Sequence, residues 1–149
     1  MRRTSFAWAA AVAAVAAVAG AAAPAAAEQP GAPGTGEVLS YPGQEGLIWI
    51  PDWVGDGGAV TGGAFPAGPP VTVTVGCRAG SGGAEEVRVA FTADYGDTTP
   101  VEFTVACPVG VVATGSAVVT AEQGRSFHVA VAASAPDVHW GLTVTQPDA

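Results

Sequence analysis

Hydrophobic and polar residues alternate along most of the second half of the chain. In the stretch VTVTVGC, residues 71–77, the valines and the cysteine share one side of an extended strand, and the threonines share the other. Residues 87–93, 101–107, 127–133 and 138–144 repeat this period of two. None of these stretches has a helical period, so the pattern predicts β-strands.

Shorter strands are expected between these segments. LIWI, residues 47–50, predicts a strand that ends at Pro51, and a further short strand is expected at 59–61. Residues 109–124 predict one or two strands broken by Gly115. Seven or eight short strands joined by Gly, Pro and Asp turns predict an all-β, antiparallel, immunoglobulin-like sandwich.

The first residues have the layout of an export signal. Two arginines precede an Ala/Val run, and a triplet of alanines follows it. This order predicts a secretory signal peptide, residues 1–27, cleaved between Ala27 and Glu28. No later segment reaches the apolar length of a membrane span, so we expect a secreted chain with no membrane attachment.

The segment after the cleavage site differs in composition from the strands. Residues 28–46 are rich in Pro, Gly and Gln, which predicts a flexible arm before a single domain of residues 47–149. Within the arm, Val38, Leu39 and Tyr41 form an apolar stretch that could dock as an edge strand.

The charge of the mature chain excludes some partners. After residue 27 the chain has three arginines, no lysine and thirteen acidic residues, a formal net charge of −10. Nucleic acids and anionic lipid surfaces require clustered basic residues, so neither is expected as a partner. Mutual repulsion at this charge favours a monomer.

The chain has two cysteines, Cys77 and Cys107, which both lie on the apolar sides of their strands. Export to an oxidising compartment, an even count and the lack of C-x-x-C or zinc-ligand spacing predict one buried disulfide. A flat three-stranded meander would hold the two cysteine strands about 9.6 Å apart, too far for a bridge. We therefore expect the strands to divide between two facing sheets, or the cysteines to lie where strand ends converge.

The runs VTVTVGC, VEFTVACPVG, FHVAVAA and VHWGLTVTQ, within residues 71–146, resemble small secreted β-sandwich proteins of high-GC bacteria, which are mainly uncharacterised. This resemblance implies the sandwich and export but no activity. The composition is also similar to that of secreted apoproteins that carry enediyne antibiotics. Those have two short-range disulfides, whereas this chain has one long-range pair, which puts a carrier role in doubt.

Acidic residues occur in pairs near turns. The pairs are Asp52 with Asp56, Glu85 with Glu86, and Asp94 with Asp97. Turn geometry alone favours Asp beside Gly, so solvated loops are the first interpretation. A loop calcium site at 94–97 or at 52–56 stays open, because carboxylates suit a hard cation.

Two histidines, His128 and His139, lie opposite the apolar sides of their strands. In a hairpin that pairs Val129 with Val138 they would be direct cross-strand neighbours, and a shift of two residues would separate them. Two histidines without a third ligand make a poor zinc site. We therefore predict no metal site, no cofactor and no catalytic residue.

The strongest candidate for ligand binding is GLIWIPDWVGDGG. Trp49 and Trp53 flank Pro51 amid Asp52 and Asp56. Exposed indoles beside carboxylates are typical of carbohydrate-binding sandwiches, while buried indoles would complete a small core. The leading hypothesis is a secreted, non-catalytic protein that binds an extracellular ligand. The alternatives are a carbohydrate- or wall-binding module that uses these four residues, and a small secreted hydrolase or a protease inhibitor with Asp94–Pro100 as its loop.

Overall fold

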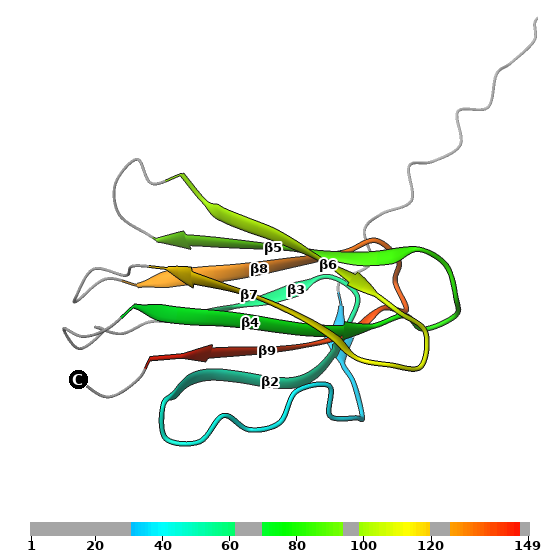
Figure 1. Ribbon diagram of the computed structural model, residues 1–149, viewed down its shortest axis with the longest axis horizontal. Coiled ribbons are helices and arrows are strands. Elements are labelled where there is room, and N and C mark those ends of the chain that lie inside the picture. Colours follow the sequence, from blue (N-terminus) through cyan, green and yellow to red (C-terminus); the bar gives the residue numbers. More distant parts are fainter. Residues whose placement is uncertain (1–30, 62–69, 94–98, 120–125, 147–149) are drawn as a thin grey trace, which may run out of the picture.

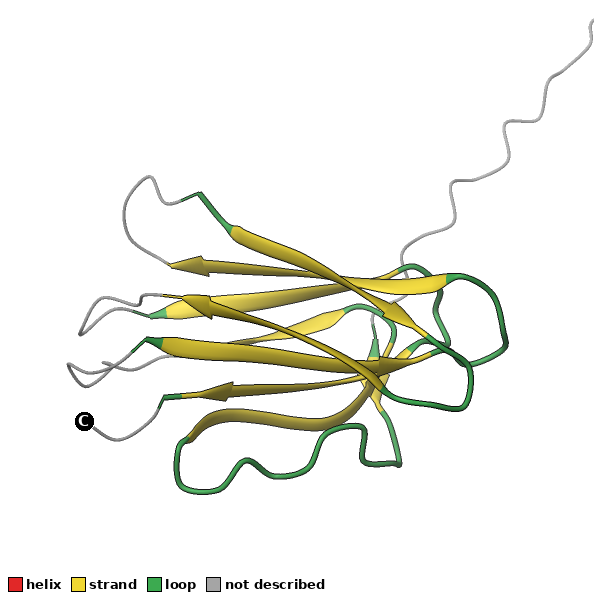
Figure 2. Cartoon of the chain, viewed as in Figure 1, coloured by secondary structure: helices red, strands yellow, loops and turns green. Residues whose placement is uncertain are grey.

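The protein is an all-β sandwich. The computed structural model describes residues 31–61, 70–93, 99–119 and 126–146, which form nine strands and no helix (Figure 2). No helix in these residues is long and apolar enough to cross a membrane. The predicted signal peptide and its cleavage site at Ala27 and Glu28 lie outside the described residues.

The strands form two antiparallel sheets that face each other (Figure 1). The five-stranded sheet has the order β1 (Ala32–Pro33), β2 (Gly46–Val54), β9 (His139–Thr145), β4 (Val71–Arg78) and β7 (Ala113–Val119). The four-stranded sheet has the order β3 (Gly57–Val60), β8 (Phe127–Ala133), β5 (Glu85–Ala93) and β6 (Val101–Cys107). The predicted all-β, antiparallel two-sheet architecture is confirmed.

The strand count of seven or eight was too low, and two strand boundaries were wrong. Gly115 does not break β7, because it pairs with Val75 within an uninterrupted register against β4. β2 does not end at Pro51, because a bulge between Ile50 and Trp53 accommodates the proline and the strand continues to Val54.

The core lies between the sheets and follows the predicted alternation. Val71, Val73 and Val75 of β4 are fully buried, and the threonines between them are only partly buried. Trp140, the largest fully buried side chain, lies in the same core and donates its indole N–H to the carbonyl oxygen of Gly55 at 2.6 Å.

The disulfide crosses this core. Cys77 on β4 and Cys107 on β6 are bonded, with Cα atoms 5.2 Å apart, inside the 5–6 Å expected for a buried bridge. β4 belongs to one sheet and β6 to the other, so the division of the cysteine strands between two facing sheets is confirmed.

Residues 31–46, expected as part of a flexible arm, lie against the domain. β1 pairs with β2, and the amides of Val38 and Leu39 both donate to the carbonyl oxygen of Pro51 at 2.7 and 3.3 Å. In Figure 1 this segment runs beside β2, on the side away from the four-stranded sheet. A domain that begins at residue 47 is therefore too short, because backbone hydrogen bonds attach these earlier residues to the sheet.

Glycines in two neighbouring strands make room for this segment. A Cβ at Gly76 of β4 would lie 2.9 Å from Leu39 Cδ2, and one at Gly141 of β9 would lie 3.0 Å from the Leu39 amide nitrogen. The two glycines face each other in the register between β4 and β9. Leu39 packs against these two glycines, so this part of the outer face of the five-stranded sheet is covered.

Candidate functional site

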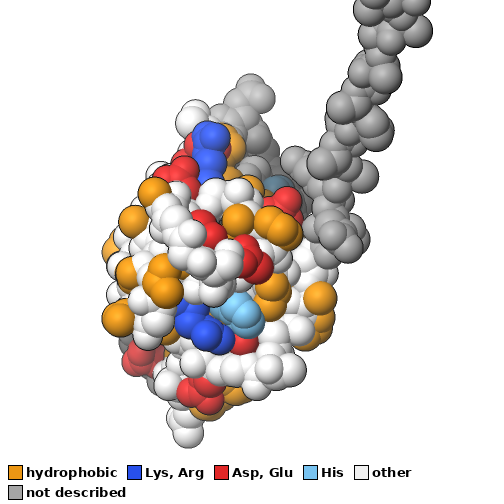
Figure 3. Space-filling view, turned by 90° about the vertical axis from the view of Figure 1, so that its right-hand side faces the viewer, with side chains coloured by type: hydrophobic (Ala, Val, Ile, Leu, Met, Phe, Trp, Pro, Cys, Tyr) orange, Lys and Arg blue, Asp and Glu red, His pale blue; other side chains and the backbone are white. Residues whose placement is uncertain are grey.

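Three charged or polar side chains meet at one end of the five-stranded sheet. Asp52, His139 and Arg78 come from the adjacent strands β2, β9 and β4. His139 Nδ1 lies 2.9 Å from Asp52 Oδ1, and because a carboxylate only accepts, Nδ1 carries the proton. Arg78 Nη2 lies 3.9 Å from Asp52 Oδ2 and 3.4 Å from His139 Nδ1, so it acts on the cluster mainly through its charge. Figure 3 looks onto this end, where basic and histidine side chains lie side by side.

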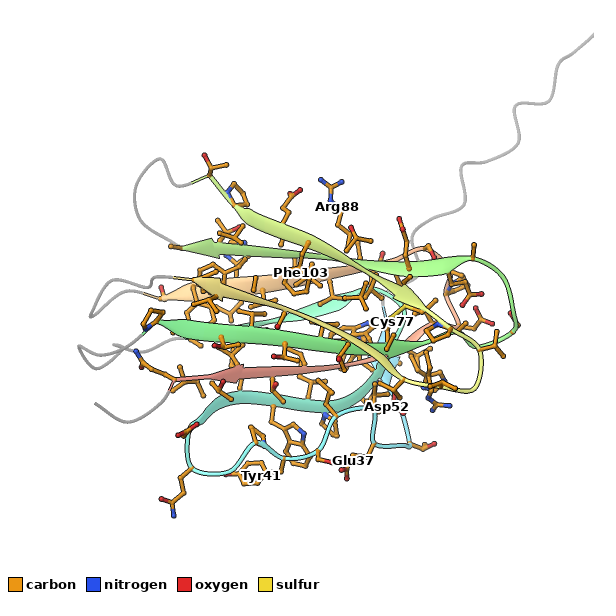
Figure 4. All side chains as sticks on the ribbon, in the orientation of Figure 1. Glu37, Tyr41, Asp52, Cys77, Arg88 and Phe103 are labelled. Carbon is orange, nitrogen blue, oxygen red and sulfur yellow. A yellow bond between two sulfur atoms is a disulfide. The ribbon has the colours of Figure 1, made fainter. Side chains whose placement is uncertain are left out.

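The Asp52 carboxylate contacts the N-terminal segment at residues 34–36 and does not face solvent. Its side chain has no exposed area, and its Oδ2 accepts a hydrogen bond from the Gly36 amide at 2.8 Å. The Gly34 amide donates to the Asp52 carbonyl oxygen at 3.1 Å, and a Cβ at Gly34 would overlap the carboxylate. The carboxylate is therefore covered by residues 34–36, and we assign it a structural role (Figure 4).

Trp49 and Trp53 do not form one platform, because they lie on opposite faces of β2. Trp49 pairs with Thr143 on the outer face, whereas Trp53 pairs with the buried Trp140. The bulge after Ile50 shifts the phase of the strand, so residues four apart change face. The sequence shows Pro51 but not this bulge, so a shared site for the two indoles was wrong.

Trp53 and Asp56 have structural partners. The Trp53 ring packs against Trp140 with ring centroids 6.3 Å apart, and its Nε1 donates to the Asp56 carbonyl oxygen at 2.9 Å. The Asp56 carboxylate accepts a hydrogen bond from the Ala133 amide at 2.7 Å, which ties the turn after β2 to β8. Of the four predicted ligand-binding residues, Trp49 alone presents its side chain on the open surface.

Trp49 has an aromatic neighbour that the sequence analysis did not select for binding. Tyr41 packs edge to face on Trp49, with centroids 5.3 Å apart and an interplanar angle of 67°. The indole N–H donates to the Leu39 carbonyl oxygen at 2.9 Å. Tyr41 is 63% exposed and Trp49 is 40% exposed, so the pair is fixed in position yet open to solvent. The apolar stretch at 38–41 was the available signal, but it indicated only an edge strand.

The outer faces of the two sheets differ in charge. On the four-stranded sheet Arg88 pairs with Glu102, whose hydrogen bond and negative charge raise the pKa of the arginine. Figure 4 shows Arg88 and Tyr41 on opposite sides of the sandwich. Beside Trp49 the strand residues on this face are uncharged: Thr72, Thr74, Ser116, Val118, Thr145 and the buried Thr143.

The two histidines are separated by the sandwich. His128 lies on β8 and pairs with Thr92 of β5, whereas His139 lies on β9 and pairs with Arg78 of β4. A hairpin that makes them direct neighbours is therefore wrong, because β8 and β9 belong to different sheets.

The acidic pairs do not assemble into a metal site within the described residues. Glu85 and Glu86 are successive residues of β5 and point to opposite faces. Asp94 and Asp97 lie outside the described residues, so the calcium hypothesis for 94–97 stays untested. No cluster of three or more His, Cys, Asp or Glu side chains occurs among the residues described.

In comparisons with known proteins, no protein-family model, no curated protein and no solved structure matches this chain. Its function is therefore inferred from the side chains described above.

Proposed function

We propose that the mature protein is an extracellular, non-catalytic binding module for carbohydrate, with Tyr41 and Trp49 as its main contact residues. The observation that carries this proposal is the fixed, exposed pair formed by the two rings, 5.3 Å apart on the outer face of the five-stranded sheet. Large aromatic side chains exposed in a defined orientation are a common basis of recognition, because they bury apolar area at low entropic cost.

Carbohydrate fits this surface better than other ligand classes. The C–H faces of a pyranose ring are apolar and can stack on an indole, while its hydroxyls need donors and acceptors nearby. Thr143, directly opposite Trp49, is buried, but Thr74 on the next strand in the same register is partly exposed and can supply such a hydroxyl. The net charge of −10 after residue 27 argues against nucleic acid and anionic lipid as ligands.

Export supports an extracellular role. The alanine-rich N-terminus has the layout of a secretory signal, and the Cys77–Cys107 disulfide persists in oxidising compartments. The fixed Asp52 and Asp56 carboxylates make structural contacts rather than a pair of free acids, which supports a non-catalytic role.

The test is retention of the mature protein on insoluble polysaccharides, such as cellulose, chitin and a bacterial wall preparation. We expect binding to at least one of them, and loss of that binding in Trp49→Ala and Tyr41→Ala. Val60→Ala is the matched control, because Val60 is 73% exposed on the opposite sheet. Wild-type protein that binds none of these materials, or retention unchanged by Trp49→Ala, would overturn the proposal.

A further inference from the structure

The aromatic pair continues into a row of hydroxyls across the sheet. In the register of the five-stranded sheet, Trp49 lies opposite Thr143, Thr143 opposite Thr74, and Thr74 opposite Ser116. The row crosses four strands, which is three inter-strand spacings or about 14 Å. Thr143 is buried, whereas Thr74 is partly exposed and Ser116 is exposed, so we call Thr74 and Ser116 the hydroxyl row. From this alignment we propose that a neutral, extended glycan lies along the hydroxyl row, perpendicular to the strands. This inference rests on the proposed function.

The hydroxyl row is preorganised for polar contacts. Its members belong to strands with continuous registers, and threonine is β-branched, so backbone and χ1 are both restricted. Each hydroxyl can donate one hydrogen bond and accept others, as sugar hydroxyls can. Within the described part of the chain neither the Thr74 nor the Ser116 hydroxyl has a hydrogen-bond partner, and neither side chain is buried, which leaves both available to a ligand.

A second row lies two residues further along the strands. Thr145 faces Thr72, and Thr72 faces Val118, which is 69% exposed. On the other side of the hydroxyl row, Leu39 and the exposed Val112 lie over Gly76 and form its border. The hydroxyl row is therefore bordered by apolar side chains on one side and continues into the second row on the other.

The lack of charge along both rows indicates which class of glycan would bind. The strand positions of both rows carry no charged residue, although the mature chain has thirteen acidic ones. No cation is present along the rows to pair with a uronate, sulfate or phosphate group. A neutral glycan satisfies the hydroxyls and the aromatic pair without leaving a charge unpaired.

The experiment is calorimetric titration of the mature protein with neutral oligosaccharides of two to six units from the polysaccharide that it retains. Affinity should rise with length and level off once the ligand spans the row. Thr74→Val and Ser116→Ala should each weaken binding about threefold to tenfold, the loss of one neutral hydrogen bond. Thr104→Val, on the exposed face of β6 in the other sheet, is the matched control and should leave affinity unchanged.

The outcomes separate the two proposals. If Trp49→Ala abolishes binding while Thr74→Val and Ser116→Ala bind like wild type, the hydroxyl row is wrong and the proposed function stands. If wild type binds none of the materials, the proposed function itself fails. Tighter binding of acidic than of neutral oligosaccharides, or a concentration-dependent dimer in sedimentation that Ser116→Arg dissolves, would also overturn the inference. Urea unfolding of each variant confirms that the fold is retained.

Discussion

Removal of the Asp52 carboxylate should weaken the attachment of the N-terminal segment to the sheet. The side chain has no exposed area and accepts hydrogen bonds from the Gly36 amide at 2.8 Å and from His139 Nδ1 at 2.9 Å. In Asp52→Ala both donors lose their acceptor. Residues 34–39 would then be held by backbone hydrogen bonds, such as that from Val38 to Pro51, and by the contacts of Leu39 with Trp49 and Gly76.

The structure sets the size of the effect. Asp52→Ala removes two hydrogen bonds to a charged acceptor, each worth about 1.5–3 kcal/mol, so the free energy of unfolding should fall by about 3–5 kcal/mol. Arg78 adds at most about 1 kcal/mol, because its side chain is 39% exposed and its nearest nitrogen is 3.9 Å from the carboxylate. Asp52→Asn should cost about 1–2 kcal/mol, because the amide oxygen can still accept from Gly36 and the NH₂ group can donate to the other tautomer of His139.

The assay is equilibrium unfolding in urea with the disulfide intact, at neutral pH. Glu37→Gln is the control, because Glu37 is an exposed acid beside Gly36 and should change the free energy of unfolding by less than about 0.5 kcal/mol. Amide hydrogen exchange gives the local measurement: protection of Gly36 and Val38 should fall in Asp52→Ala more than protection of β4. Equal losses for the alanine and asparagine variants, or unchanged protection of Gly36, would refute the role assigned to this carboxylate.

Further outcomes are expected from other parts of the molecule. Unfolded, unreduced protein should show no free thiol, and reduction of the Cys77–Cys107 bridge should lower the free energy of unfolding by about 2–5 kcal/mol; titration of two thiols would contradict this. Gly141→Ala should reduce the amide protection of Leu39, because the new Cβ would lie 3.0 Å from that amide and has only backbone to displace. Ala at the exposed Gly110 is not a suitable control because its φ is +73°, so Gly83→Ala, whose nearest neighbour lies at 3.9 Å, serves instead. Protein recovered from the culture medium should begin at Glu28, and an intact mass that includes Met1 would disprove cleavage.

Local patterns determined the strands and the disulfide. Alternation places Val71, Val73, Val75 and Cys77 on one side of β4 whatever the rest of the chain does, because successive side chains of an extended strand point to opposite faces. The limited reach of a disulfide then excluded a flat meander and left either facing sheets or converging strand ends, and the structure shows the two cysteine strands in facing sheets.

The tertiary structure alone decided which side chains share a surface. A bulge shifts the phase of β2 by contacts with β9, so Trp49 faces outward and Trp53 inward. Tyr41 contacts Trp49 from a segment whose Leu39 packs against two glycines of other strands. Asp52 meets His139 across 87 positions of sequence, and His128 is separated from His139 because consecutive strands enter different sheets. Period and spacing are properties of neighbouring residues, whereas bulges, sheet assignment and the docking of a segment depend on non-local contacts that no single stretch of sequence contains.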